Sequence, residues 1–294
     1  MEGVELVGVV DINPSRAREI AKRTHTQAFS HHSELFNRAQ AVSIAVPTPF
    51  HHTIAKDFFR HGIDVLLEKP ISRTLEEADE LIGLAELKGI IFQIGHLERF
   101  NGALSVIEGI VQNPLFIESQ RMGPFSGRET DVNVVLDLMI HDIDIILNLV
   151  HSKPKLLQAV GTPVITHHID IANARIEFEN GCTANLTASR ISKEKTRKTR
   201  IFQTDGMLSI DYLSQKAFSS KRVTHPGKDE NPELVTNEIP VKKRDLLEAE
   251  IRSFLLSVRS RKEVEVSGRD GRRALEVALQ IVQKIEEHIG DKKL

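Results

Sequence analysis

The sequence predicts an α/β protein in which a doubly wound parallel (Rossmann) sheet precedes an α+β domain with a largely antiparallel sheet. Over residues 5–95, continuous apolar strand patterns alternate with helical patterns, which is typical of a parallel sheet covered on both faces. After Asn113-Pro114 the apolar residues recur at every second position, as in an antiparallel sheet with one covered face. We therefore expect domains at 1–113 and 114–294, with room for the last helix to pack back on the first domain.

The first half contains four strand patterns separated by helices. Each strand is a short run of Val, Ile and Leu, and Pro14 suits the first position of a helix. The expected strands are 5–11, 41–46, 64–68 and 90–95, and the expected helices are 14–22, 51–61 and 75–87. Parallel strands end at one edge, which is where open α/β sheets bind ligands.

In the second half, a mostly apolar helix is followed by hairpins. Asn180-Gly181 and Asp205-Gly206 are typical tight turns between alternating strands. The expected elements are a helix at 134–150, strands at 172–178, 182–188, 201–204 and 207–210, and closing helices at 244–261 and 270–289. The last helix carries Ala274, Ala278, Ile281 and Ile285 on one stripe.

Composition narrows the class of protein. The 294 residues carry 39 basic and 41 acidic side chains, and a net charge of −2 argues against a dedicated nucleic-acid binder. No apolar run is long enough to span a bilayer, and the first residues lack the pattern of a signal peptide. The one cysteine, Cys182, fits a reducing compartment. We expect a cytoplasmic protein that binds neither nucleic acid nor membrane.

Polar residues follow several of the predicted strands. These residues lie at the carboxyl edge, and the family resemblance described below implies that they line a cofactor: Asp11, Pro47, Thr48, His51, Glu68, Lys69, Pro70 and His96. Each also has a plain structural interpretation, for example a turn carboxylate for Asp11 and a surface helix residue for His51. Lys69 is the sharper candidate, because a lysine between Glu68 and Pro70 at the end of a buried strand would be partly desolvated.

Asp137 and His141 are four residues apart and would share one face of an α-helix. A solvated surface pair fits poorly, because this helix is mostly apolar and an unpartnered buried acid is costly. A carboxylate that orients an imidazole for proton transfer fits better. A third interpretation adds Asp144 to the two residues as a metal site, but it explains neither Lys69 nor the nucleotide-type sheet. We therefore predict no metal.

The order of these motifs resembles the Gfo/Idh/MocA (glucose-fructose oxidoreductase and inositol dehydrogenase) family over nearly the whole chain. The motifs are Asp11, Pro47-Thr48 with His51, Glu68-Lys69-Pro70, Gly95-His96-Leu97-Glu98-Arg99-Phe100 and Asp137-x-x-x-His141. The resemblance implies an NAD cofactor, with NADP possible, and a sugar or nucleotide-sugar substrate whose secondary hydroxyl is oxidised to a ketone. It also implies Lys69, Asp137 and His141 as catalytic residues, and a homo-oligomer.

The start of the chain departs from the family pattern. An NAD-binding fold opens with a strand, a G-x-G-x-x-G turn and a helix, and the acidic residue on the ribose follows about 20 residues later. Asp11 takes that acidic place with only ten residues before it. We therefore expect an N-terminally truncated domain that lacks its first strand and Gly-rich turn. A start assigned to an internal methionine is preferred over a truncated relic.

A basic run, Lys193 to Arg200, is usually a solvated hairpin face, but beside an active site it would suit a phosphate or diphosphate. With the motifs above, it resembles the branch that oxidises nucleotide sugars, such as UDP-N-acetylglucosamine 3-dehydrogenases. Two other classes stay open. A non-catalytic binding or regulatory protein would agree with the missing glycine turn, and a metal-dependent hydrolase would need no nicotinamide.

Overall fold

The computed structural model describes residues 1, 3–125, 127, 132–223 and 233–291. The chain divides into two compact units: Met1–Gly95 with Glu250–Arg272, and His96–Ala249 with Arg273–Leu294. The division therefore falls at residue 95 rather than 113, and the first unit takes up a later segment of the chain. Among the described residues, no helix has both the length and the hydropathy that a membrane span requires.

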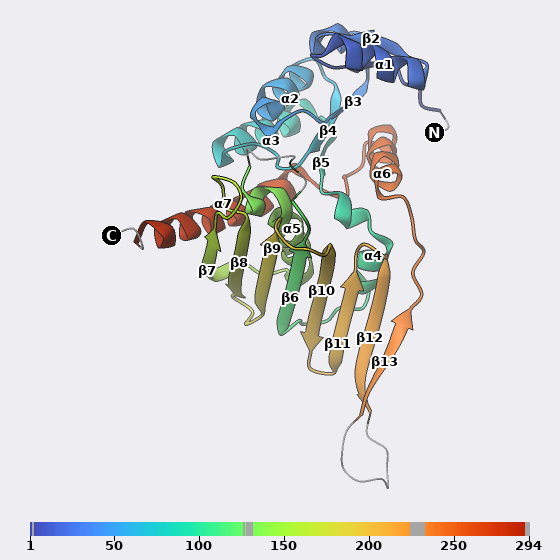
Figure 1. Ribbon diagram of the computed structural model, residues 1–294. Coiled ribbons are helices and arrows are strands. Elements are labelled where there is room, and N and C mark those ends of the chain that lie inside the picture. The colour runs from blue at the N-terminus through green and yellow to red at the C-terminus, as the bar shows by residue number, and fades with distance from the viewer. Residues whose placement is uncertain (2, 126, 128–131, 224–232, 292–294) are drawn as a thin grey trace. The chain divides into compact units, whose positions relative to one another are not determined.

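The first unit is built from short parallel strands and helices (Figure 1). Its strands are β1 (Gly8–Val10), β2 (Gln27–Phe29), β3 (Ala41–Ile44), β4 (Asp64–Glu68) and β5 (Phe92–Gly95). Its helices are α1 (Pro14–Thr24), α2 (His51–Arg60), α3 (Leu75–Lys88) and most of α6 (Leu246–Ser260), with 3-10 turns at His32–Leu35 and Thr48–Phe50. Asn13 caps α1 and Thr74 caps α3, each by accepting backbone N–H groups, as residues at this position commonly do.

All pairings between the first unit's named strands are parallel, as the sequence predicts. β1 pairs with β2, whereas β3, β4 and β5 form a separate triplet in that order. The described part of the chain shows no ladder between β1 and β3. The middle of the central strand β4 is apolar, and its residues Val65, Leu66 and Leu67 are buried.

The second unit has one eight-stranded sheet, and Figure 1 shows its strands in a single continuous layer. The order is β13-β12-β11-β10-β6-β9-β8-β7, and every pair except β6 and β9 is antiparallel. The strands are β6 (Phe116–Met122), β7 (Pro154–Thr162), β8 (Ile171–Phe178), β9 (Thr183–Ser189), β10 (Thr196–Gln203), β11 (Gly206–Asp211), β12 (Lys216–Val223) and β13 (Glu233–Ile239). The helical segments are Leu97–Phe100, α4 (Gly102–Glu108), Val135–Met139, α5 (Ile140–Val150) and most of α7 (Gly268–Asp291).

The core of the second unit follows the predicted alternation. On β8 and β9 the apolar residues at every second position are buried, and Gly181 takes the left-handed conformation (φ +87°) that the tight turn between them requires. The predicted stripe of α7 is also confirmed, since its four residues are each fully buried. The helix expected at 134–150 is present, but its first turn, Val135–Met139, is a π-helix.

Candidate active site

The carboxyl ends of β3, β4 and β5 carry the first group of candidate residues. Because the three strands are parallel, the Glu68-Lys69-Pro70 segment after β4 lies at the same edge as the end of β5. Lys69 is half-buried and Pro70 is buried, with a cis peptide bond between them. β4 therefore places the amine of Lys69 at the carboxyl edge of the sheet, as predicted.

Glu68 and Lys69 interact with each other at this strand end. The Glu68 carboxylate accepts a hydrogen bond from the backbone N–H of Lys69. Burial raises the pKa of Glu68, and the positive charge of Lys69 opposes that rise. Glu68 therefore supplies a local counter-charge to the lysine.

His51 connects two strand ends. Its ring is 1% exposed, with Nδ1 2.8 Å from the carbonyl oxygen of Pro70 and Nε2 2.8 Å from that of Val46. Burial lowers the pKa of His51, the two carbonyl oxygens act to raise it, and the charge of Lys69 lowers it further. His51 thus links the segments that follow β3 and β4 through the contacts of its two ring nitrogens with backbone carbonyl oxygens.

Asp11 follows β1 directly and is held in a local turn. One carboxylate oxygen accepts the N–H of Asn13 at 2.8 Å, and the other lies 3.7 Å from Arg16 Nη1. The Arg16 side chain is 70% exposed, so this ion pair is weak. Asp11 therefore has the structural role of a turn residue. Its partly exposed carboxylate also lies at a strand end, which is where this type of fold places the ligand of the ribose.

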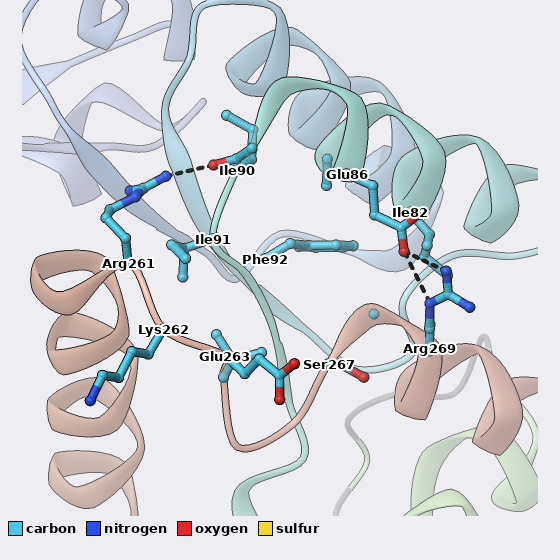
Figure 2. A pocket seen from close by; sticks show the side chains of 14 residues that line it. Ile82, Glu86, Ile90, Ile91, Phe92, Arg261, Lys262, Glu263, Ser267 and Arg269 are labelled. Atoms are coloured by element: carbon cyan, nitrogen blue, oxygen red, sulfur yellow. Dashed lines mark hydrogen bonds and ion pairs between the residues drawn. The ribbon is translucent and has the colours of Figure 1, made fainter.

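Pro47 and Thr48 come after β3, where Thr48 begins a 3-10 turn and Pro47 is exposed. A cavity of about 600 Å³ in this unit lies elsewhere: Gly89 to Phe92 line it, and they lead into the amino end of β5 (Figure 2). Figure 2 also shows Arg269 in contact with Glu86 at this cavity. The cavity is therefore at the edge of the sheet opposite to Lys69.

The second unit holds the remaining candidates. Asp137 lies within the π-helix Val135–Met139, and His141 follows in the first turn of α5. The rings of His96 and His141 are perpendicular, with their centroids 6.3 Å apart. A π-turn is often found at a functional site. The structure thus brings His96 and His141 together and sets Asp137 in a widened turn before them.

A buried ionic cluster lies in the same unit, and the sequence analysis missed it. Arg121 of β6 donates to both carboxylate oxygens of Asp142 and, from Nη1, to Glu98 at 3.0 Å. Burial raises the pKa of Asp142, and the Arg121 guanidinium opposes the rise. Asp144 lies 3.9 Å from Arg99. No group of three or more potential metal ligands occurs within the described ranges.

The basic run lies mostly within β10, where its cations are paired. Arg197 contacts Glu98 at 3.1 Å, Arg200 contacts Glu118 at 2.7 Å, and Lys198 lies 3.8 Å from Asp211. Lys193 and Lys195 precede the strand and are exposed. The run is therefore mainly a strand whose cations form ion pairs, which is close to the interpretation of the run as a solvated hairpin face.

This chain belongs to the Gfo/Idh/MocA family of oxidoreductases. Residues 1–96 match the oxidoreductase family with an NAD-binding Rossmann fold, and residues 101–209 match the C-terminal domain of the same family. Both units therefore carry the family's pattern, and the first unit is an NAD-binding domain.

Several relatives share most of the chain. The sequence is 36% identical to UDP-N-acetylglucosamine 3-dehydrogenase from Acidithiobacillus ferrooxidans, over 96% of this chain and 90% of that protein, and a solved structure of that enzyme gives a TM-score of 0.89. It is 25% identical to an NAD-dependent scyllo-inositol 2-dehydrogenase from Bacillus subtilis over 72% of this chain and 67% of that protein. A scyllo-inositol dehydrogenase from Lactobacillus casei with bound NAD(H) and scyllo-inositol shares the fold, with TM-score 0.79, 19% identity and coverage of 98% and 91%.

The residues of the first unit fit two parts of a nicotinamide dinucleotide. The Asp11 carboxylate suits the adenosine ribose, and Lys69 lies at the strand edge where this fold places its ligand. The sequence contains no G-x-G-x-x-G motif, so the pyrophosphate contact that such a turn provides is not assigned to a residue of this chain.

Proposed function

We propose that this protein is an NAD-dependent dehydrogenase that oxidises a secondary hydroxyl of a nucleotide sugar, with Lys69, Asp137 and His141 as its catalytic residues. The observation that carries the proposal is the position of Lys69 at the carboxyl end of β4 in an NAD-binding domain. The nucleotide-sugar substrate is favoured by the 36% identity to a UDP-N-acetylglucosamine 3-dehydrogenase across 96% of the chain. NADP remains an alternative cofactor.

In this mechanism, NAD⁺ supplies the hydride acceptor when bound. The Lys69 ammonium polarises the substrate hydroxyl and favours its ionised form. The His141 imidazole accepts the hydroxyl proton as the carbon is oxidised, and the Asp137 carboxylate orients and stabilises the imidazolium that forms. The proton thus ends on His141, and the two electrons of the C–H bond leave as hydride.

The remaining binding residues have supporting roles in the proposal. Asp11 would bind the adenosine ribose, and Pro47 and Thr48 would line the cofactor. His51 would fix the strand ends from which the cofactor is approached, as its two carbonyl contacts suggest. His96 would pack against the catalytic imidazole, as its ring contact suggests.

The quaternary state and the compartment are proposed as well. A homo-oligomer would cover the open face of the eight-stranded sheet, where Leu156 and Val160 of β7 are each about half exposed. A cytoplasmic location would suit the single buried thiol, Cys182. Sedimentation equilibrium of the purified protein tests the first proposal, since a monomer at all concentrations would contradict it.

The catalytic assignment is tested by NADH formation on a panel of sugars and sugar nucleotides. Lys69→Ala and His141→Ala should each lower kcat by about 10²–10⁴ with the Kd for NADH nearly unchanged. The double variant should lose little more than either single variant, because the groups act on one proton. Lys88→Ala, at the exposed end of α3, is the matched control. Retained activity in the double variant would refute the assignment, and cofactor binding with no turnover on any substrate would favour a non-catalytic binding protein.

A further inference from the structure

A second buried carboxyl group, outside the proposed catalytic residues, lies in the first unit. Glu250 of α6 is 1% exposed, and Gln93 of β5 donates from Nε2 to its backbone carbonyl at 3.4 Å. Among the described residues, Oε1 of Glu250 and Oε1 of Gln93 are both buried without a hydrogen-bond donor. Two buried acceptors without a donor are costly, and a proton on Glu250 would supply the missing donor.

Glu68 extends from the same face of the sheet as Gln93. The parallel ladder pairs Leu66 with Gln93 and Glu68 with Gly95, so Glu68 and Gln93 share a face. A Cβ at Gly95 would lie 3.0 Å from Glu68 Oε2 and 3.1 Å from its Cδ. The Glu68 carboxyl therefore lies directly over Gly95, on the face of the sheet that meets Glu250 through Gln93.

The two carboxyl groups cannot both ionise cheaply in this buried place. Burial and the charge of Glu68 raise the pKa of Glu250 to about 8. Glu68 is different, because the ammonium and the backbone N–H of Lys69 both favour its charged form. The charge consequently belongs on Glu68 and the proton on Glu250.

The other groups around the pair are consistent with this assignment. β5 presents the neutral Gln93, while Asp64 at the start of β4 is paired with Arg261. On α6 itself, Glu248 and Arg252 are exposed. The ammonium of Lys69 acts on the Glu68 member of the pair.

We propose that Glu68 and Glu250 form a carboxyl pair with a single negative charge and the proton on Glu250, and that this pair positions the ammonium of Lys69. The first part concerns the protein alone, and the second rests on the proposed function. Glu250 is then a positioning residue, since it acts on Lys69 through Glu68. Ionisation of Glu250 would add a second anion beside Glu68 and draw the ammonium toward the pair, away from the hydroxyl.

The proton on Glu250 is tested without any activity measurement. Infrared spectra of the purified protein at pH 6.5 should contain the carbonyl stretch of a buried protonated carboxyl group. Glu250→Gln should remove that band, and the exposed Glu248→Gln on the same helix should keep it. A spectrum in which Glu250→Gln changes no protonated-carboxyl band would overturn the pair, whatever the enzyme does.

The positioning role is tested by the pH dependence of kcat. The wild-type kcat should fall above pH 8, and Glu250→Gln, which stays neutral, should keep neutral-pH activity within about twofold while losing this alkaline limb. Glu250→Leu removes the hydrogen-bond donor as well and should lose about tenfold, the equivalent of one hydrogen bond. An unchanged alkaline limb in Glu250→Gln would refute the role. If the infrared band behaves as expected but the wild type turns over no substrate, the pair stands and the proposed function fails.

Discussion

The Glu250→Gln substitution should change how the stability of the first unit depends on pH. The Glu250 carboxyl has its pKa raised from 4.5 to about 8 in the folded protein. Between those pH values, the unfolded chain releases the proton whereas the folded protein keeps it. The free energy of unfolding therefore falls as pH rises through this interval, by about 1.4 kcal/mol per pH unit and about 5 kcal/mol in total. Glutamine has no proton to release, so the variant lacks this slope.

The assay is urea denaturation followed by far-ultraviolet circular dichroism at several pH values from 4.5 to 9. Circular dichroism is preferable to intrinsic fluorescence, because the chain has no Trp and one Tyr, which lies in the second unit. The free energy of unfolding of the wild type minus that of Glu250→Gln should be larger near pH 5 than at pH 8. This difference should stop changing above pH 8. Glu248→Gln should follow the wild type. Equal pH dependence of wild type and Glu250→Gln would refute the buried neutral carboxyl.

Three other substitutions test separate parts of the structure. Arg121→Met leaves the buried Asp142 carboxylate without its cation and leaves Glu98 with Arg197 alone, so it should cost about 3–5 kcal/mol in urea denaturation, and a loss below about 1 kcal/mol would contradict the cluster. Burial acts to raise the pKa of Asp170, but hydrogen bonds from three backbone N–H groups and Thr166 lower it to about 2, so its stabilisation is full above pH 3.8 and lost toward pH 2. As the pH falls from 3.8 toward 2, the free energy of unfolding of Asp170→Asn should accordingly decrease by about 2 kcal/mol less than that of the wild type. A Cβ at Gly95 would also lie 3.1 Å from Cα of Glu68, so Gly95→Ala should displace the Glu68 carboxyl, lower kcat severalfold and lower Tm, and unaltered kcat would argue against the tight approach.

The parallel strands of the first unit were predictable because each is encoded locally. β4 is an apolar run with a polar residue at each end, and its observed bounds, Asp64–Glu68, are those expected from the sequence. The residues after these strands could be placed at one edge for the same reason, since parallel strands end together. The position of Lys69 at this edge could therefore be predicted without knowledge of its neighbours.

Elements stabilised by distant partners could not be predicted in this way. β6 contains Arg121, a charged residue at 2% exposure, and only the carboxylates of Asp142 and Glu98 make that burial tolerable. The local sequence of a strand does not indicate which distant residues will pair with it. The same holds for Glu250, which in the sequence is one of several acids on an amphipathic helix and becomes distinctive only beside Glu68 and Gln93.

The relation between Asp137 and His141 combines both cases. The four-residue spacing places two side chains on one face only if the helix is an uninterrupted α-helix. Here Asp137 lies in a π-turn and His141 in the α-helix that follows, so the wider turn sets the angle between them. The flanking residues Val135 and Met139 are fully buried, which fixes the widened turn against the core. The pairing of Asp137 with His141 therefore stays a prediction from the sequence, whereas packing of the π-turn determines the course of the backbone that carries Asp137.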